Sequence, residues 1–169
     1  MLGTCGPLSL LRKELTEPFV LMNGDILTTL DFSVAMEYAL GLDSYLTIVT
    51  KEIVTPFAFG KVMTDGDYVN DIQEKPDISL EILAGIYLMK PPVLQFIPDD
   101  QFYNIDTLIK EMLRSGHRVG RYLMEEYWLD IGTVEHYEHA QSAYRDHFQD
   151  LKQEAAPDPD QVAPTRDEV

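Results

Sequence analysis

Two aspartates each follow an apolar segment, although they lie far apart in the sequence. Asp25 ends the segment 19–25, and Asp130 lies in the segment 127–133. One interpretation of each is an ordinary turn or cap residue whose carboxylate bonds nearby backbone N–H groups. The other is a shared Mg²⁺ site, because magnesium is commonly held by one or two carboxylates together with substrate phosphates.

A second group of chemically useful side chains lies in Glu74-Lys75-Pro76. One interpretation is a solvated charged loop that the proline fixes. In the other, Glu74 accepts hydrogen bonds from sugar hydroxyls while Lys75 meets a phosphate as a point charge. Lys75 stands out because the chain has 13 basic residues against 29 acidic ones.

The histidines and the cysteine offer no comparable site. His136 and His139 share one face of a predicted helix without a convincing third metal ligand, so a solvated polar face is the favoured interpretation. Cys5 has no partnered histidine in a recognisable motif, and we expect it to be a small packing residue.

The net charge of −16 argues against binding to nucleic acid or to an anionic membrane. An acidic domain that handles phosphates needs a divalent cation to mediate, which again favours Mg²⁺. The N-terminus lacks the features of a secretory signal, and no apolar run is long enough to span a bilayer. A single cysteine fits a reducing compartment, so we expect a cytoplasmic protein.

The elements that must position these residues alternate between strands and helices. This order predicts an α/β fold with a Rossmann-like, mostly parallel mixed sheet, flanked by helices and carrying an inserted β-hairpin. Residues 1–150 form the predicted domain, and residues 151–169 form a predicted disordered acidic tail. We expect strands over 19–22 (buried on both faces), 45–50, 82–89 and 117–124, and a hairpin over 57–72. We expect helices over 7–15, 31–41 (capped by Asp31), 91–96, 105–113 (amphipathic) and 133–150.

Five segments, in order and together spanning roughly residues 2 to 145, resemble one family, the sugar-nucleotide pyrophosphorylases. The most similar types are the mannose-1-phosphate guanylyltransferases and the glucose-1-phosphate nucleotidyltransferases. The segments are Leu2-Gly3-Thr4-Cys5-Gly6-Pro7-Leu8, Pro18-Phe19-Val20-Leu21-Met22-Asn23-Gly24-Asp25, Phe59-Gly60-Lys61-Val62 with Glu74-Lys75-Pro76, Ala84-Gly85-Ile86-Tyr87, and Tyr127-Trp128-Leu129-Asp130-Ile131-Gly132.

The resemblance implies a Mg²⁺-dependent nucleotidyltransferase that forms an NDP-sugar and pyrophosphate from an NTP and a sugar 1-phosphate. It implies that Asp25 and Asp130 bind the catalytic Mg²⁺, that Glu74 contacts the sugar hydroxyls, and that Lys75 contacts the sugar phosphate. The implied substrate-binding positions are Gly3, Thr4 and Gly6 against the nucleotide base, and Gly60 and Gly85 in the sugar pocket.

The sequence also departs from this family. The family's opening loop, of the type Gly-x-Gly-Thr-Arg, and its Lys-Pro segment hold the triphosphate, and neither is found here. Leu83 stands where many relatives carry an asparagine that faces the sugar, and Glu126 stands where a glycine usually precedes the Tyr-Trp pair. We therefore expect an N-terminally truncated domain with little or no pyrophosphorylase activity, because the triphosphate would lose its positive partners. Exposed sheet edges would favour self-association or a partner chain that supplies the other part.

Two further interpretations remain open. In the first, the chain is a non-catalytic nucleotide-sugar-binding or regulatory protein that complements a partner carrying the glycine-rich loop. In the other it is a metal-dependent glycosyltransferase. That class usually shows an Asp-x-Asp motif after an apolar strand, and Asp65-Gly66-Asp67 instead falls at a predicted hairpin turn.

Overall fold

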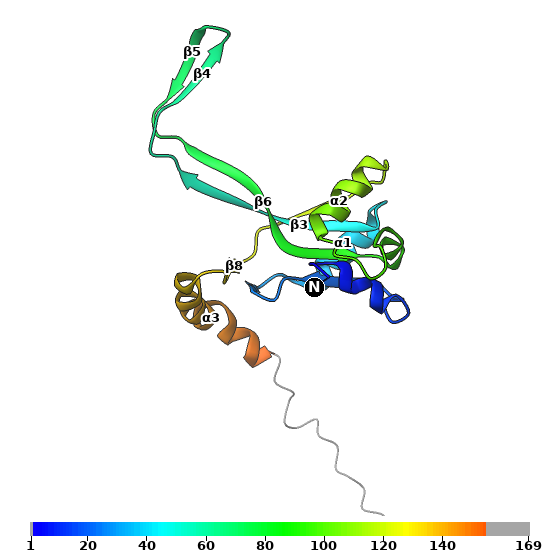
Figure 1. The fold of residues 1–169 in the computed structure, drawn as a ribbon. Coiled ribbons are helices and arrows are strands. Elements are labelled where there is room, and N and C mark those ends of the chain that lie inside the picture. The colour runs from blue at the N-terminus through cyan, green and yellow to red at the C-terminus, as the bar shows by residue number, and fades with distance from the viewer. Residues whose placement is uncertain (1, 155–169) are drawn as a thin grey trace, which may run out of the picture.

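A mixed four-stranded sheet forms the centre of the computed structural model, which describes residues 2–154 and the side chains of residues 2–148 (Figure 1). Its strands are β1 (Phe19–Met22), β3 (Leu46–Pro56), β6 (Asp77–Met89) and β7 (Gly120–Met124). In the order β1-β6-β3-β7, β6 pairs antiparallel with both β1 and β3, while β3 and β7 are parallel. β1, β3 and β7 therefore run in one direction, which confirms the predicted mixed α/β sheet. The expectation that the sheet is mostly parallel is wrong, because β6 lies between β1 and β3 and pairs antiparallel with both.

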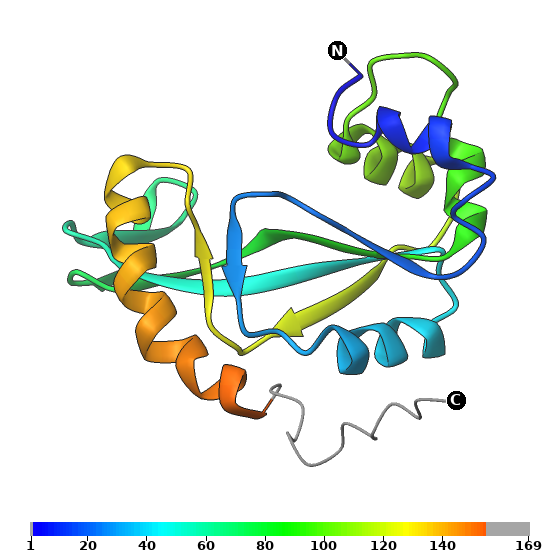
Figure 2. The same cartoon turned by 90° about the horizontal axis from the view of Figure 1, so that it is seen from below.

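Helical elements cover both faces of this sheet (Figure 2). The first core cluster lies beneath η1, η2 and α2, and the second beneath α1. In β6, Tyr87 and Met89 belong to the first cluster, whereas Ile86 and Leu88 belong to the second, as the alternation of a strand requires. These elements are two 3₁₀-helices, η1 (Gly6–Leu11) and η2 (Pro91–Phe96), and two α-helices, α1 (Phe32–Gly41) and α2 (Ile105–Arg114).

The start of α1 confirms a predicted helix cap. Asp31 Oδ1 accepts hydrogen bonds from the N–H groups of Ser33 (2.8 Å) and Val34 (3.1 Å). These are two of the N–H groups that a helix cannot satisfy within itself.

The expectation that β1 is buried on both faces is wrong. Val20 and Met22 are 38% and 40% exposed. β1 is an edge strand of the sheet, and its residues alternate between half-buried and exposed. A short apolar run does not by itself distinguish a central strand from an edge strand.

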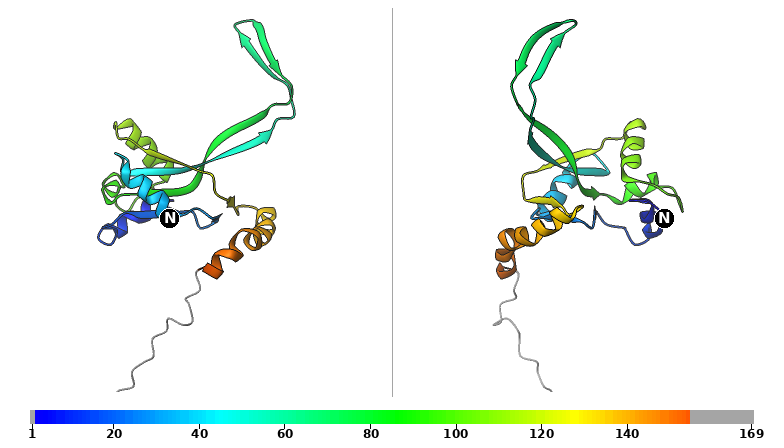
Figure 3. Two further views of the ribbon diagram at one scale, coloured as in Figure 1. Left: turned by 180° about the vertical axis from the view of Figure 1, so that it is seen from behind. Right: turned by 60° about the vertical axis from the view of Figure 1, so that its left-hand side comes forward.

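A long arm extends from the sheet. β3 and β6 continue as a paired ribbon to Pro56 and Asp77, and the hairpin of β4 (Lys61–Asp65) and β5 (Tyr68–Gln73) lies at its end (Figure 3). The predicted Asp-Gly turn is confirmed, with Gly66 at φ 58°. Most of the arm's side chains are exposed.

The sequence patterns do not predict a second, small sheet. β2 (Ile26–Thr28) pairs antiparallel with β8 (Trp128–Asp130). The last helix, α3 (Val134–Glu154), follows β8, and the rest of the predicted tail lies outside the described residues. None of the helices within residues 2–154 has the length and apolarity needed to cross a membrane.

Candidate functional site

The pairing of β2 with β8 brings the two aspartates together. Asp130 is the register partner of Ile26, and the N–H of Ile131 donates to the carbonyl oxygen of Asp25 at 2.8 Å. Asp25 and Asp130 therefore occupy adjacent positions on two neighbouring chain segments. The structure thus brings the two candidate residues close together along the backbone, although the sequence separates them widely.

Gly85 of β6 holds the segment that carries Asp25. The N–H of Asn23 donates to the carbonyl oxygen of Gly85 at 2.9 Å. Gly85 has φ 71°, and a Cβ atom there would lie 2.9 Å from Nδ2 of Asn23. A side chain at position 85 would meet both an unfavourable backbone conformation and a steric overlap, so glycine is required for this approach.

Trp128 fixes the second segment to the same strand. Its Nε1–H donates to the carbonyl oxygen of Ala84 at 2.8 Å. The N–H of Thr29 donates to the carbonyl oxygen of Tyr127 at 3.2 Å, and the N–H of Tyr127 donates to Thr29 Oγ1 at 3.1 Å. Three of the sequence segments that suggested a site, at residues 23–25, 84–87 and 127–132, are therefore joined by direct hydrogen bonds.

His136 and Lys51 contact the chain segment 125–130, and the sequence patterns predict neither contact. His136 Nδ1 lies 2.7 Å from the carbonyl oxygen of Asp130, and since a carbonyl can only accept, Nδ1 is the donor. Lys51 Nζ donates to the carbonyl oxygens of Glu125 and Glu126, both at 2.8 Å, and so holds the segment between β7 and β8. A lysine in a strand carries no local sequence signal for such a contact.

The donor chemistry of the aspartate pair fits a Mg²⁺ ion. Asp25 is exposed and Asp130 partly exposed, so both carboxylates reach solvent. Asp130 Oδ1 accepts from the N–H of Gly132 at 2.8 Å, which orients the side chain and leaves its second oxygen for a cation. Among the residues with described side chains, no group of three or more His, Cys, Asp or Glu forms a metal cluster. Two carboxylates nevertheless suffice for magnesium, which keeps water and phosphate oxygens as its other ligands.

Glu74, Lys75 and Gly60 lie elsewhere, at the base of the β4–β5 hairpin. A Cβ atom at Gly60 would lie 3.3 Å from Glu74 Oε2, so these two residues are neighbours. Glu74 and Lys75 are exposed, and Lys75 has the positive φ of 43°. The hairpin extends away from β8 (Figure 1), so the structure does not bring this group to the aspartate pair.

The segment containing Gly3, Thr4 and Gly6 contacts the start of α2. Thr4 Oγ1 accepts from the N–H of Ile105 at 2.9 Å, and the N–H of Gly6 donates to the carbonyl oxygen of Tyr103 at 3.0 Å. Gly3 has φ 77°, and a Cβ atom there would lie 2.6 Å from that same carbonyl oxygen. These backbone groups are used within the fold, and the structure does not bring them to the aspartate pair. Their role against a nucleotide base stays a prediction.

Cys5, in the same segment, is fully buried in the first core cluster, which confirms its interpretation as a packing residue. Burial, and to a smaller extent the charge of Asp106, raises the pKa of the Cys5 thiol to about 12. The thiol is therefore neutral near pH 7 and a poor nucleophile.

The chain is similar to known nucleotidyl transferases over most of its length. The family model described as Nucleotidyl transferase matches residues 2–147. The UTP--glucose-1-phosphate uridylyltransferase of Synechocystis sp. is 31% identical over 147 residues, which cover 80% of this chain and 38% of that protein. The mannose-1-phosphate guanylyltransferase catalytic subunit beta of Danio rerio is 30% identical over 138 residues, which cover 78% of this chain and 38% of that protein. The chain spans about 38% of the length of these curated relatives.

Solved structures show the same fold. HddC from Yersinia pseudotuberculosis superposes with a TM-score of 0.60 at 28% identity, over 85% of this chain and 63% of that one. HddC complexed with GMP-PN superposes with a TM-score of 0.57 at 26% identity, over the same shares. Because the family model spans nearly all of the described residues and the fold agrees, this chain belongs to the nucleotidyl transferase family.

Proposed function

We propose that this chain carries the metal- and sugar-binding side of a sugar-1-phosphate nucleotidyltransferase. The reaction forms an NDP-sugar and pyrophosphate from an NTP and a sugar 1-phosphate, in the cytoplasm. The observation that carries the proposal is the β2–β8 pairing, which places Asp25 and Asp130 at adjacent positions. The curated relatives are named for reactions of this class.

In this reaction an oxygen of the sugar 1-phosphate forms a bond to the α-phosphorus of the NTP. The bond from that phosphorus to the oxygen that bridges to the β-phosphorus breaks, and pyrophosphate leaves with that oxygen. A Mg²⁺ ion held by Asp25 and Asp130 would offset the phosphate charge. The chain's own contribution is position, because the Asn23–Gly85 and Trp128–Ala84 hydrogen bonds fix both carboxylate-bearing segments on β6.

Glu74 and Lys75 keep their proposed roles toward the sugar hydroxyls and the sugar phosphate. Because they lie on the arm, they would reach a sugar phosphate held at the aspartates if the arm approached β8. The exposed side chains of the arm mean that such a movement would break few packed contacts. Lys75 is one of few cations in the acidic chain, so its arrival would add the positive charge that a phosphate needs.

A second candidate function is nucleotide-sugar binding without turnover. The separation between Lys75 and the aspartate pair favours it. A site without the lysine's positive charge can hold a metal-bound ligand without stabilising the transfer of the nucleotidyl group. In this case a partner chain would complete the site. The exposed apolar side chains of Val20 and Met22 on the edge strand β1 offer it a surface, which self-association could also cover.

Calorimetric titration tests the proposed site. GDP-mannose and UDP-glucose should bind with Mg²⁺ and lose at least tenfold in affinity with EDTA. Asp25→Asn and Asp130→Asn should each cause a comparable loss with Mg²⁺ present. Asp67→Asn makes the same charge change at the exposed hairpin turn and should leave affinity unchanged.

An activity assay separates the two functions. Pyrophosphate released from NTP and sugar 1-phosphate, and lost in Asp25→Asn and in Lys75→Ala, would establish the transferase. Magnesium-dependent binding without pyrophosphate release would establish the binding function. Magnesium-independent binding that is equal in the wild type, Asp25→Asn and Asp130→Asn would rule out the proposed metal site.

A further inference from the structure

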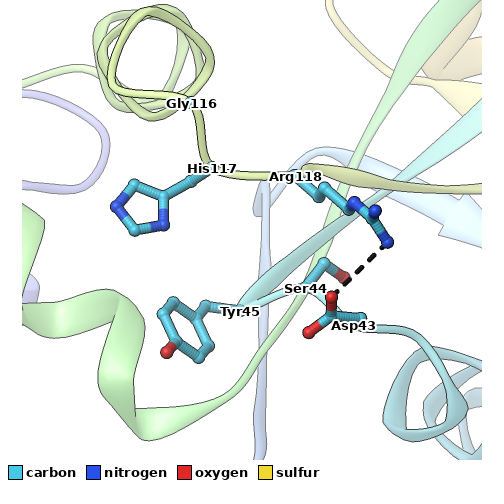
Figure 4. Close-up of a pocket in the computed structure, with 6 residues that line it drawn as sticks. All are labelled: Asp43, Ser44, Tyr45, Gly116, His117 and Arg118. Carbon is cyan, nitrogen blue, oxygen red and sulfur yellow. Dashed lines mark hydrogen bonds and ion pairs between the residues drawn. The ribbon is translucent and has the colours of Figure 1, made fainter.

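An open cavity of about 210 Å³ lies at the edge of the sheet where β3 and β7 begin. Tyr45 and His117 face each other across it, and Arg118, Ser44 and Asp43 lie at one end (Figure 4). The ring centroids of Tyr45 and His117 are 6.1 Å apart, with an angle of 38° between the planes. The cavity is therefore a slot with two aromatic walls and a polar end.

Local structure holds both walls in place. The N–H of Gly116 donates to the carbonyl oxygen of Leu113 at 3.1 Å, and the N–H of His117 donates to that of Met112 at 2.9 Å. With Gly116 at φ 79°, these bonds end α2 and turn the chain, and His117 is the first residue after this turn. The ring of Phe96 lies 4.7 Å from His117 in an edge-to-face arrangement and 6.4 Å from Tyr45, so it supports both walls of the slot.

Tyr45 is held through its backbone, and its ring contacts Phe96 and His117 while remaining partly exposed. Its carbonyl oxygen accepts the N–H of Lys90 at 2.9 Å, yet the residue is 37% exposed. A planar ring inserted between two others needs roughly 7 Å between the outer rings, since contacting carbon atoms lie about 3.5 Å apart. Tyr45 thus has to move outward by a small amount for the slot to accept a ring.

The polar end offers a donor group and an acceptor group side by side. Arg118 Nη1 lies 3.4 Å from Asp43 Oδ2, and their side chains are 79% and 92% exposed. An ion pair this exposed contributes little stability, so a ligand can replace it at low cost. Arginine pairs with O6 and N7 of guanine, and a carboxylate can accept from the N1–H and N2–H groups of the same base.

We propose that this slot binds the guanine base of a nucleotide, stacked between Tyr45 and His117 and paired at its edge with Arg118 and Asp43. The cavity is smaller than the pockets that enclose whole drug-sized ligands. It suits a single base, with the ribose and phosphate outside. The proposal stands independently of the proposed function at the aspartate pair.

The slot and the aspartate pair lie at opposite ends of the strands of the sheet. Phe19 of β1 and Leu46 of β3 are both register partners of Met89, so Tyr45 lies beside the beginning of these strands. Asn23 and Asp25 follow the end of β1, about 13 Å further along. A nucleotide in the slot is therefore a second ligand, separate from one held by Asp25 and Asp130.

Titration with GMP in the presence of EDTA tests the proposal while no Mg²⁺ is available to the aspartate pair. We expect the wild-type chain to bind GMP, with at least tenfold weaker affinity in Tyr45→Ala and in His117→Ala. Tyr68→Ala removes a tyrosine that is 80% exposed on the arm, and it should bind as the wild type does, as should Asp25→Asn. In the wild type, GMP should shift the amide NMR signals of Ser44 and Gly116, which keeps the test valid if a slot variant fails to fold.

Three outcomes would overturn the proposal. The first is no GMP binding by the wild type at millimolar concentration. The second is a loss of binding in Asp25→Asn while Tyr45→Ala binds normally, which would assign GMP to the aspartate pair. The third is equal affinity for GMP, UMP and ribose 5-phosphate, which would show that the chain recognises the phosphate and not the base. Guanosine competing with GMP would support the base-stacking slot.

Discussion

β6 passes through two regions that share a strand but differ in what surrounds them. Residues 84–89 are buried between two core clusters, whereas Leu80 and Leu83, earlier in the strand, are 59% and 45% exposed. Both regions pair with β3, on either side of a register shift between Ile48 and Thr50, and only residues 86–89 also pair with β1. The comparison shows that ladder hydrogen bonds determine where the strand runs, while packing on its two faces determines how firmly it is held.

The same contrast separates the candidate site residues. Asp25 and Asp130 are fixed by contacts to the buried half of β6, through Gly85 and Ala84. Lys75 follows the exposed hairpin of the arm. We therefore expect changes near residue 85 to affect folding and metal binding together, and changes on the arm to leave folding intact.

The largest expected effect comes from two leucines of the same strand. Leu88→Ala, at a side chain 1% exposed, should lower the free energy of unfolding by about 3 kcal/mol, because it removes buried methyl groups and leaves a cavity. Leu80→Ala, on the arm, should change it by less than about 0.5 kcal/mol. Urea denaturation followed by circular dichroism measures both. Equal losses would mean that the arm packs as firmly as the sheet centre.

Two glycines of positive φ sharpen the comparison. Gly85→Ala should cost about 2 kcal/mol, because its Cβ atom overlaps Asn23 in addition to straining the backbone. Gly66→Ala, at the hairpin turn, has no atom within 4 Å of the added Cβ and should cost about 1 kcal/mol for the backbone alone. The same denaturation series checks the difference. A Gly66 cost as large as the Gly85 cost would refute the role given to the Asn23 contact.

Removal of one hydrogen bond should have a smaller effect. Trp128→Phe keeps a smaller aromatic ring but loses the Nε1–H bond to Ala84, and it should cost at least about 1 kcal/mol. It should also weaken Mg²⁺-dependent ligand binding, since this bond fixes the segment that carries Asp130. Tyr68→Phe on the arm is the control and should change neither property. Unchanged stability in Trp128→Phe would contradict the role of this bond.

A pH dependence from Cys5 has the smallest expected effect near neutral pH, where the thiol is protonated in both the folded and the unfolded chain. Its folded-state pKa of about 12 lies above the ordinary value of 9.0, so ionisation favours the unfolded chain. The stability that this thiol contributes is complete below pH 9 and is lost as the pH rises toward 12. The wild type should therefore lose stability more steeply above pH 9 than Cys5→Ala does, in thermal scans at stepped pH. Burial also raises the pKa of Tyr87 and of Tyr103, but these tyrosines are present in the wild type and in Cys5→Ala alike, so they do not cause the difference. Parallel pH profiles would contradict a buried neutral thiol.

Local signals predicted the elements whose formation depends on neighbouring residues. The Asp31 cap, the Asp-Gly hairpin turn and the amphipathic helix α2 were all expected from short stretches of sequence. β2 and β8 were not, because three-residue strands are too short to show an alternating pattern and their partners are far apart in the sequence. The exposure of β1 was missed because an apolar run does not report the strand's place in the sheet.

The sequence by itself determined the family resemblance, the acidic charge and the identity of the two candidate carboxylates. Such properties depend on residue type and on order along the chain. Tertiary structure alone decided that Asp25 and Asp130 meet through β2 and β8, that Lys75 stands apart on an arm, and that Tyr45 and His117 face each other. Each of these depends on contacts between residues distant in sequence, which form only when the chain packs around a common core.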